Sequence, residues 1–313
     1  MIGVVGLNYW GPNLARNFAD LGALSWLCDL DEQRLAAASA RHPGVSTTTS
    51  YDELLASEIS AVAIATAVPT HYTLAKQALE AGKHVFVEKP PAMLTTEIDE
   101  LVALAAERDL ALMPGHLLLY HPGVRKLKEL IDSGELGEVR CVYGNRQNLG
   151  IVRANENALW SLGVHDLSVI LYLLDEDPEL ATAQGSWSFN EGVEDVVFCF
   201  LRFPSGKIAH MHLSWLDPHK MRKMTVVGLE KMVVFDDMEP ERKVTVYEKK
   251  VNSSSEAVSG DITIPKISNA EPLRLECEYF LELLDGKHDK AKVARDGARV
   301  VRALEMLTNS LDG

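Results

Sequence analysis

The segment from Gly6 to Gly11 begins and ends with glycine and lies between an apolar run, Ile2–Val5, and a helical stretch expected from Asn13 to Leu21. A glycine turn between a strand and a helix is typical of a dinucleotide fingerprint, in which helix-start N–H groups hold the pyrophosphate. Asn8 stands where this pattern usually has Gly, and we expect it to tolerate a positive φ. The alternative is an ordinary strand–helix turn. The residues expected to contact the dinucleotide are Gly6, Asn8, Tyr9, Trp10 and Gly11.

Asp29 lies 23 residues after Gly6, at the end of the next predicted strand. A carboxylate in this place hydrogen-bonds the adenosine ribose hydroxyls of a dinucleotide. The residues that follow are Leu30 and Asp31, with no Arg to receive a 2′-phosphate, so the sequence favours NAD over NADP. The alternative role is an N-cap of the following helix. One of the two carboxylates can cap while the other binds ribose.

Lys89 belongs to the segment Glu88–Pro91, directly after the predicted strand His84–Val87. Ligands bind beyond the carboxyl ends of strands in parallel sheets, so Lys89 is placed to meet one. An ammonium there can hydrogen-bond a substrate hydroxyl and lower its pKa as hydride leaves the carbon. The two prolines make the turn rigid, and the bond before Pro90 is a candidate cis peptide. The alternative is a surface lysine in a rigid turn.

His165 opens an apolar helix, Val164–Leu174, in the second half of the chain. Histidine titrates near neutrality and suits general acid/base work. Two alternatives remain at this point: His165 bonded to its neighbours, and Asp166 as the helix N-cap alone.

Other patterns favour structural roles. His210 and His212 share a strand face and His219 follows, but no cysteine pair or fixed carboxylate accompanies them, so we expect no metal site. No Gly-x-Ser-x-Gly nucleophile elbow is present. We expect the tryptophans at positions 160, 187 and 215 in the core or at an interface.

Two different patterns divide the chain into elements. Up to about residue 118, short apolar runs alternate with helices, which predicts a doubly wound parallel sheet of the Rossmann type. The second half has two helices and then closely spaced strands joined by turns, which predicts an α/β domain with a large, open, mostly antiparallel sheet. We therefore expect a dinucleotide-binding domain over 1–118 and a substrate and oligomerisation domain over 119–313, which includes the closing helices. The Ser-rich stretch Asn252–Ser259 is expected to be a solvated loop.

Composition narrows the function classes. The chain has 313 residues, with 31 Lys and Arg against 45 Asp and Glu, a net charge of −14. This argues against binding nucleic acid or anionic membrane through bulk charge. No apolar run is long enough for a membrane helix and no secretory signal is evident. Four scattered cysteines, expected to be reduced, fit a cytoplasmic protein.

These motifs, in this order, resemble the glucose-fructose oxidoreductase / inositol dehydrogenase / rhizopine catabolism (Gfo/Idh/MocA) family over nearly the whole chain. The matching segments are the glycine turn, 64–66, 69–72, 87–90, 115–116, the helix at 124–133 and its ending at 134–137. The resemblance implies an NAD(P)-dependent dehydrogenase that acts on the CH–OH group of a sugar or polyol.

The resemblance also implies roles for individual residues. Thr66, Pro69 and His71 would lie near the pyrophosphate and nicotinamide ribose, and Glu88 beside the nicotinamide. Lys89 would contact the reacting hydroxyl and the cofactor, and His165 would be the general acid/base. Many members have Asp four residues before this His, where this chain has Ser161, which implies a branch that works with Lys and His alone.

That branch is similar to the 3-dehydrogenases of nucleotide-activated amino sugars in surface polysaccharide pathways. Arg146, Asn148, Arg153, Ser161 and His165 would then contact the substrate, and two arginines in an acidic protein fit an anion such as a UDP-sugar. The alternative is that both arginines make structural ion pairs.

The leading expectation is an enzyme that oxidises a ring hydroxyl, C3, of a UDP-N-acetylhexosamine or its uronate with NAD. The alternatives are a 3-ketosugar reductase, a free polyol or inositol-type dehydrogenase, and a catalytically silent NAD-binding regulator. Strands 196–203 and 208–215 carry apolar residues on both faces, which predicts a homodimer or homotetramer built through the second sheet.

We predict that NAD binds at least about tenfold more tightly than NADP, roughly 1.4 kcal/mol. A phosphate dianion placed beside Asp29 and Asp31 is repelled by both carboxylates. Titration calorimetry with the two cofactors measures the difference, and equal affinities would refute the ribose role of Asp29.

Overall fold

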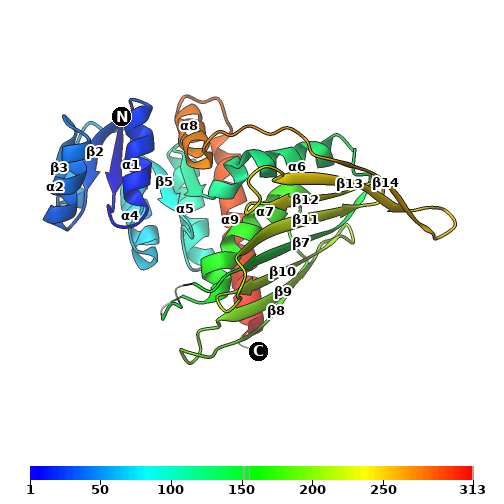
Figure 1. Ribbon diagram of the computed structural model, residues 1–313. Helices are drawn as coiled ribbons and strands as arrows, with labels where there is room; N and C mark the ends of the chain where they lie inside the picture. The colour runs from blue at the N-terminus through cyan, green and yellow to red at the C-terminus, as the bar shows by residue number, and fades with distance from the viewer. Residues whose placement is uncertain (151, 155, 312–313) are drawn as a thin grey trace. The chain divides into compact units, whose positions relative to one another are not determined.

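The computed structural model describes residues 1–150, 152–154 and 156–311, which belong to two units (Figure 1). Unit 1 consists of Met1–Leu117 and Glu271–Arg302, and unit 2 of Leu118–Ala270 and the chain from Ala303 onward. The sequence analysis expected both closing helices in the second domain. The first of them, and most of the second, lie instead in unit 1.

Unit 1 contains a six-stranded sheet in which every pairing is parallel, with strand order β3-β2-β1-β4-β5-β6. The strands are β1 Ile2–Val5, β2 Leu24–Cys28, β3 Ser46–Thr48, β4 Ala61–Ile64, β5 His84–Glu88 and β6 Leu112–Gly115. This is the doubly wound order of dinucleotide-binding domains, and it confirms the predicted parallel sheet. Because the strands are parallel, the segments after β1, β2, β4 and β5 emerge at one edge.

Helices fill the connections between these strands. They are α1 Gly11–Asp20, α2 Glu32–Arg41, α3 Tyr51–Ala56, α4 His71–Glu80 and α5 Thr95–Glu107, with α8 Pro272–Leu284 and α9 Lys290–Leu311 near the end of the chain. The sequence analysis missed β3 and α3. Both are short, and β3 is largely exposed, so neither carries the apolar run that reveals a strand or helix.

Both faces of this sheet are covered. Phe86 of β5 makes edge contacts with Phe18 of α1 and Phe280 of α8 on one face. Its neighbours Val85 and Val87 point to the other face, where α4, α5 and the start of α9 pack. The Phe280 contact is the physical reason that α8 belongs to unit 1.

Unit 2 contains an eight-stranded sheet with the order β14-β13-β12-β11-β7-β10-β9-β8. Its strands are β7 Val139–Gln147, β8 Leu180–Ser186, β9 Val196–Arg202, β10 Ile208–Ser214, β11 Met221–Gly228, β12 Met232–Asp236, β13 Val244–Val251 and β14 Ala257–Thr263. Only β7 and β10 pair in parallel, which confirms the mostly antiparallel sheet.

The predicted loop Asn252–Ser259 is wrong in its second half, because β14 starts at Ala257. Asn252 turns the chain: its Oδ1 accepts hydrogen bonds from the N–H groups of Ser254 and Glu256, both at 2.9 Å. The strand that follows is exposed along its whole length, so its composition is that of a loop.

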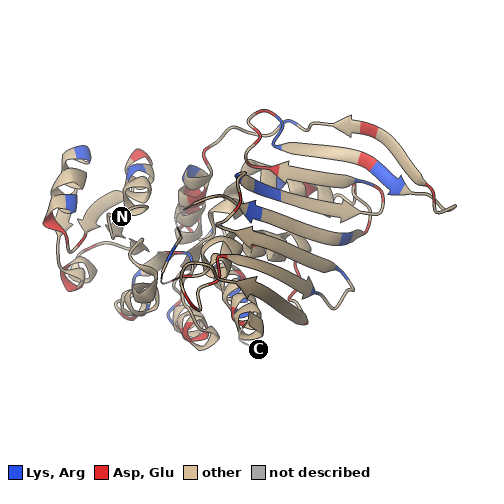
Figure 2. Ribbon diagram, turned by 60° about the horizontal axis from the view of Figure 1, so that its bottom comes forward, with Lys and Arg blue, Asp and Glu red and all other residues tan. Residues whose placement is uncertain are grey.

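One face of the second sheet is covered by α6, Pro122–Asp132, and α7, Val164–Leu174. Side chains along β9 and β10 alternate between this buried face and the exposed face. Cys199 and Met211 are buried, whereas Phe198 and Phe200 are 56% and 39% exposed. Figure 2 shows few charged residues along β8, β9 and β10, and more on β13. No helix among the described residues is both long and apolar enough to cross a membrane.

A buried ion pair joins α7 to this sheet. Arg146 of β7 donates two hydrogen bonds, of 2.8 and 2.7 Å, to one oxygen of Asp166 on α7. Both side chains are almost fully removed from solvent. Because His165 precedes Asp166, the pair also limits where the start of α7 lies on the sheet.

We predict that Arg146→Met lowers the free energy of unfolding by about 3–5 kcal/mol, because it leaves the Asp166 carboxylate buried without its partner. Urea unfolding measures the loss. The double variant Arg146→Met/Asp166→Leu is expected to recover most of it. Arg153→Met, at an exposed ion pair, is the control and is expected to change stability by less than about 0.5 kcal/mol. An Arg146→Met protein as stable as this control would contradict the structural role.

Candidate functional site

The turn after β1 has room only for glycine at its first and last positions, Gly6 and Gly11. Gly6 has a φ of +87°, and a Cβ there would lie 2.8 Å from the backbone of Ala65 after β4. A Cβ on Gly11 would lie 1.7 Å from the carbonyl oxygen of Gly6. The helix α1 therefore starts directly against the end of β1. It has no side-chain cap, so its first N–H groups are suited to a phosphate.

Asn8, Tyr9 and Trp10 complete this turn. Asn8 and Tyr9 are exposed, and the Trp10 side chain donates a hydrogen bond to the carboxylate of Glu88, the last residue of β5. The tolerance of Asn for a positive φ is not used at Asn8: the described non-glycine residues with positive φ are Asp109, Asp175 and Ser255. The turn takes its left-handed step at Gly6, so Asn8 does not need that conformation.

Asp29 contacts the backbone of the glycine turn and does not cap the helix that follows it. Its Oδ2 accepts a hydrogen bond of 2.5 Å from the N–H of Leu7, and its Oδ1 one of 2.9 Å from Asp31. Asp31 is the residue that caps α2, through the N–H groups of Gln33 and Arg34. Of the two carboxylates, Asp29 is therefore the one left at the end of β2 beside the turn.

Arg34 is a cation that the sequence analysis did not consider. Its guanidinium lies 3.8 Å from Asp29 and 3.3 Å from Asp31 and is 44% exposed. Its spacing of three residues from Asp31 on a helix was the available signal. The three groups together still carry one net negative charge, which is consistent with the expected preference for NAD.

His71 connects the segment after β4 to the Lys89 turn. Its Nδ1 lies 2.8 Å from the Pro90 carbonyl oxygen and its Nε2 3.1 Å from that of Thr66. Burial lowers the pKa of His71, so the neutral ring donates to one of these carbonyls. The Thr66 and Thr70 hydroxyls are hydrogen-bonded, with their oxygens 2.7 Å apart, and Pro69 between these residues is exposed. His71 thus contacts backbone on both sides.

The Lys89 turn follows β5 and contains a cis peptide bond between Lys89 and Pro90. Glu88 Oε2 accepts a hydrogen bond of 3.3 Å from the Lys89 backbone N–H. Burial raises the pKa of Glu88 to about 7, although Lys89 and the hydrogen-bond donors favour its anion. Lys89 also interacts electrostatically with His71 and His116. The predicted cofactor residues after β1, β2, β4 and β5 are therefore brought together by direct contacts.

Two buried titratable groups beside this turn were missed as site residues. His116 follows β6, and burial lowers its pKa to about 4. Glu276 lies on α8 and is fully buried. The signal for Glu276 was its helical spacing from Leu273 and Phe280, which puts a carboxyl on the apolar face of α8.

His165 lies in unit 2, at the second residue of α7, and is partly buried. The helix is preceded by a π-helical turn, Leu159–Gly163, which contains the buried Ser161. Asp166 is not an N-cap, because its carboxylate pairs with Arg146. Trp160 is buried and donates a 3.0 Å hydrogen bond to Thr308. Trp215 is also buried, whereas Trp187 is half exposed.

The predicted anion-binding arginines both have carboxylate partners. Arg146 pairs with Asp166 as described, and Arg153 lies 3.1 Å from Glu156 while remaining 54% exposed. These contacts are the structural ion pairs that the sequence left as the alternative. Asn148 lies just past β7, where its N–H donates to the Ser214 carbonyl at 3.1 Å.

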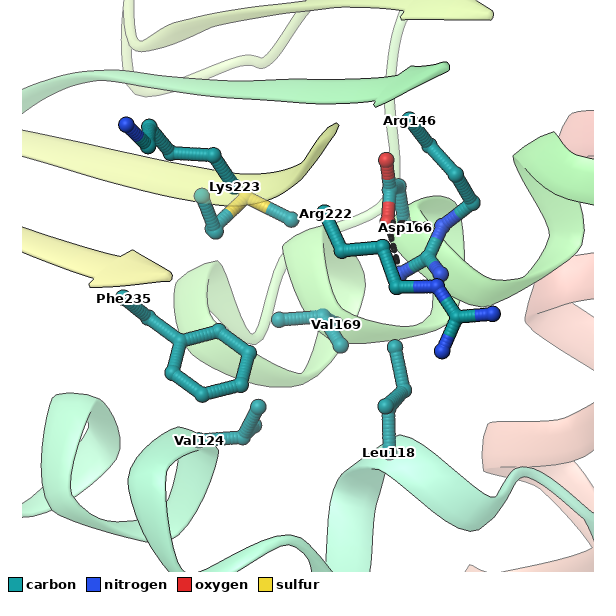
Figure 3. Close-up of a pocket in the computed structure, with 9 residues that line it drawn as sticks. Leu118, Val124, Arg146, Asp166, Val169, Arg222, Lys223 and Phe235 are labelled. Atoms are coloured by element: carbon teal, nitrogen blue, oxygen red, sulfur yellow. Dashed lines mark hydrogen bonds and ion pairs between the residues drawn. The ribbon is translucent and has the colours of Figure 1, made fainter. Parts of the chain in front are cut away.

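A small cavity of about 10 Å³ adjoins the Arg146–Asp166 pair (Figure 3). Figure 3 shows Arg222 from β11 and Val169 from α7 on its walls, with Phe235 from β12 at one side. Asp166 Oδ2 is buried and has no hydrogen-bond partner among the described residues. The volume is about that of one water and far below that of a sugar. This cavity is therefore not a substrate pocket.

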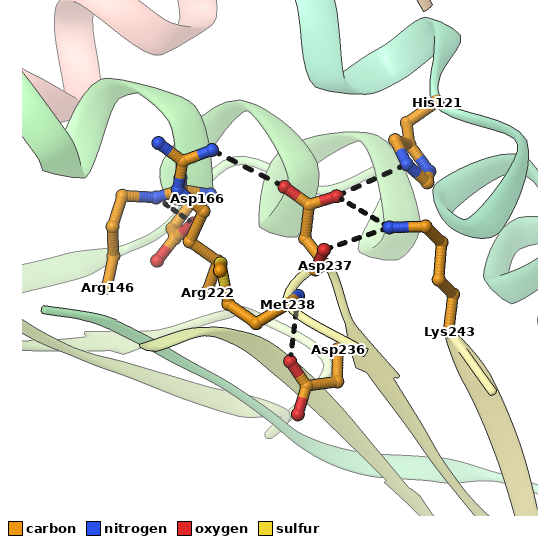
Figure 4. A network of polar contacts seen from close by, with 8 residues as sticks. All are labelled: His121, Arg146, Asp166, Arg222, Asp236, Asp237, Met238 and Lys243. Atoms are coloured by element: carbon orange, nitrogen blue, oxygen red, sulfur yellow. Dashed lines mark hydrogen bonds and ion pairs between the residues drawn. The ribbon is translucent and has the colours of Figure 1, made fainter. Parts of the chain in front are cut away.

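A charged network centred on Asp237 lies beside this cavity (Figure 4). The carboxylate meets His121 Nε2 at 3.4 Å, Lys243 at 3.3 Å and Arg222 at 3.6 Å. His121 Nδ1 accepts from the N–H of Gly123 and caps α6, so Nε2 carries the proton that faces Asp237. The His121 hydrogen bond and the nearby cations lower the pKa of Asp237. All these groups are satisfied by one another, which indicates a structural network.

Two family profiles match this chain. The profile described as "Oxidoreductase family, NAD-binding Rossmann fold" matches residues 1–116, and the "GFO/IDH/MocA C-terminal domain" matches residues 124–234. The two matches cover more than half of the chain.

Individual relatives agree with the profiles. The UDP-N-acetylglucosamine 3-dehydrogenase of Acidithiobacillus ferrooxidans is 28% identical over 235 residues, 75% of this chain and 73% of that protein. Its solved structure has the same fold, with a TM-score of 0.85 over 99% of this chain and 97% of that one at 24% identity. GenD2 from gentamicin A biosynthesis, solved in complex with NAD, is 26% identical, with a TM-score of 0.83 over 99% and 93% of the two chains.

The myo-inositol 2-dehydrogenase of Thermotoga maritima is 26% identical over 220 residues, 66% of each chain. Other curated relatives are matched over about 60% of their own length. The two profile matches agree with the doubly wound sheet and with the motifs in the sequence. The chain belongs to the Gfo/Idh/MocA family of oxidoreductases, with NAD as its cofactor.

Proposed function

We propose that this protein oxidises a ring hydroxyl, C3, of a UDP-N-acetylhexosamine or its uronate with NAD. The observation that carries the proposal is the position of Lys89, at the carboxyl end of β5 and one residue after the Glu88 that Trp10 of the glycine turn contacts. The similarity to a UDP-N-acetylglucosamine 3-dehydrogenase over three quarters of the chain supports the choice of substrate.

The residues of unit 1 fit the cofactor. Gly6 and Gly11 open the turn, the uncapped start of α1 suits the pyrophosphate, and Asp29 is held beside the turn for the ribose. When bound, NAD accepts the hydride that leaves the substrate carbon. Thr66, Pro69, His71 and Glu88 are proposed to complete this side of the site.

The proton of the substrate hydroxyl is handled by the chain itself. The Lys89 ammonium donates a hydrogen bond to the hydroxyl oxygen and lowers its pKa, so that the alkoxide character needed for hydride loss develops at lower cost. His165 accepts the hydroxyl proton, a role that requires its neutral ring. Asn148, Arg153 and Ser161 are proposed substrate contacts. Arg146 is proposed to contact the substrate through Nη1, because its Nε and Nη2 donate to Asp166.

A free polyol or inositol-type substrate is the second candidate. The ion pairs of the two predicted anion-binding cations favour it, since Arg146 is paired with Asp166 and Arg153 with Glu156. A relative that is a myo-inositol 2-dehydrogenase supports it. A thermal-shift screen with NAD, comparing UDP-N-acetylhexosamines, their uronates and inositols, separates the two. A shift with the inositols alone would contradict the nucleotide-sugar proposal.

We predict that Lys89→Met lowers kcat/KM at least about 100-fold while NAD still binds. Methionine is apolar and has no proton to donate to the substrate hydroxyl, whereas the cofactor contacts come mainly from the glycine turn. Lys76→Met is the matched control, since Lys76 pairs with Glu100 on the surface of unit 1. Turnover of the Lys89→Met protein within about threefold of wild type would exclude this role.

We also propose that the chain forms a homodimer or homotetramer through the open face of the second sheet. On this face Phe198 stacks on His212 with ring centroids 4.2 Å apart, and Tyr143 on His210 at 4.8 Å. These flat rings, with Phe200 beside them, form an exposed surface of little charge that a second copy can cover.

We predict that light scattering at micromolar concentration gives twice or four times the chain mass of 34.5 kDa. Phe198→Glu puts a charge in the centre of this face and is expected to shift the protein toward monomer. A monomeric wild-type protein would overturn the proposal, as would a Phe198→Glu protein with an unchanged mass.

A further inference from the structure

Glu276 is a fully buried carboxyl in the middle of α8. Neither of its oxygens has a hydrogen-bond partner among the residues that the structure describes. Buried charges in proteins are normally paired, and buried polar groups are normally hydrogen-bonded. An unpaired carboxyl in the interior of unit 1 therefore calls for an explanation other than packing.

The surroundings of Glu276 lead to the Lys89 turn. Phe280, one helical turn after Glu276, packs against Phe86 of β5 with ring centroids 5.7 Å apart. Glu88 follows Phe86 by two residues, on the same face of the strand. The charge of the Glu88 carboxylate disfavours ionisation of Glu276. Two interacting carboxyls therefore lie on the side of the sheet that α8 covers, and one of them precedes Lys89.

The two carboxyls are not equivalent. Three groups favour the anion of Glu88: the Lys89 ammonium, the Lys89 backbone N–H at 3.3 Å and the Trp10 side chain. Among the residues that the structure describes, no comparable group favours the anion of Glu276, and burial and the Glu88 charge both act against its ionisation. When two buried carboxyls cannot both ionise, the proton stays on the one whose anion is less stabilised.

We propose that Glu276 is a positioning residue of the reaction, a carboxylic acid that keeps its proton beneath the Lys89 turn so that Glu88 is the single anion beside Lys89. The proposal rests on the proposed role of Lys89 in the reaction. A neutral Glu276 adds no second negative charge, and the dipole of its acid group can stabilise the Glu88 anion through the buried interior of unit 1. Glu276 acts through Glu88 and does not touch the substrate.

The other titratable groups near the pair leave this assignment intact. His116 is neutral above about pH 5, because burial lowers its pKa to about 4, and burial also keeps His71 neutral. Burial raises the pKa of the Cys277 thiol, so it stays protonated. The other titratable groups that interact with the pair or with its direct neighbours are Lys89 after β5, His116 after β6, His71 at the start of α4, and Cys277 on α8, which itself interacts with Arg16 and Glu271.

Infrared spectroscopy of the full chain tests where the proton lies, without any substrate. At pH 8, wild-type protein is expected to show the carbonyl stretch of a buried carboxylic acid. Glu276→Gln and Glu276→Met are expected to lose this band. Glu278→Gln, which removes a partly exposed glutamate of the same helix, is expected to keep it.

Glu276→Met is expected to fold even if the Gln variant does not, because it removes an unpaired buried polar group. A wild-type spectrum without the band, or a band that persists in both Glu276 variants, would overturn the proposal.

The pH dependence of kcat/KM, measured with UDP-N-acetylglucosamine, tests the effect on Glu88. Burial raises the pKa of Glu88 to about 7, so the Lys89 turn loses its anion as the pH falls through neutrality and the rate falls with it. Glu276→Met removes the acid dipole and is expected to move this acid limb upward by at least about half a pH unit. Glu276→Gln is expected to return the apparent pKa of the acid limb to the wild-type value, because a neutral amide replaces the neutral acid.

The same apparent pKa in the wild type and in both variants would show that Glu276 has a purely structural role. If this substrate is not turned over, the proposed function fails, and the infrared result still decides the state of Glu276.

Discussion

The close approach of the start of α1 to the end of β1 is the constraint on which the rest of unit 1 depends. A side-chain carbon at Gly11 would lie 1.7 Å from the Gly6 carbonyl oxygen, so the approach exists only because Gly11 has none. It directs the uncapped end of α1 toward the edge where the parallel strands finish. It also brings Trp10 to the Glu88 carboxylate, which connects the glycine turn to the turn that carries Lys89.

Buried charge is used differently in the two units. In unit 2, Arg146 and Asp166 neutralise each other and hold α7 on its sheet, and the Asp237 network satisfies the groups beside them. Such pairs contribute little net stability relative to apolar residues, but they penalise any other packing of these elements. In unit 1, Glu88 and Glu276 are two buried acids, of which only Glu88 has a lysine that favours its anion, and burial raises the pKa of both. Perturbed groups of this kind are concentrated at functional sites.

Family membership and substrate rest on different parts of the chain. The glycine turn, Asp29 and the Lys89 turn are the parts proposed to handle the cofactor and the hydride, and relatives of this chain act on different sugars and polyols. Most of the residues proposed to distinguish those substrates belong to unit 2. There the arginine that most resembled an anion site is occupied by Asp166, so the sequence motif alone did not reveal the charge that a ligand would meet.

Local patterns in the sequence predicted what depends on neighbouring residues: the parallel and antiparallel sheets, the glycine turn, Asp29 at the end of β2 and Lys89 after β5. Contacts between distant segments were decided only by the tertiary structure. Phe280 packs α8 against Phe86, which lies nearly two hundred residues earlier in the chain. Asp166 pairs with Arg146 of β7, 20 residues earlier. The exposed strand β14 and the unpaired Glu276 likewise depend on where other elements pack. Hydrophobic period and turn chemistry act over a few residues, whereas the partner of a buried charge is set by which elements the fold brings together.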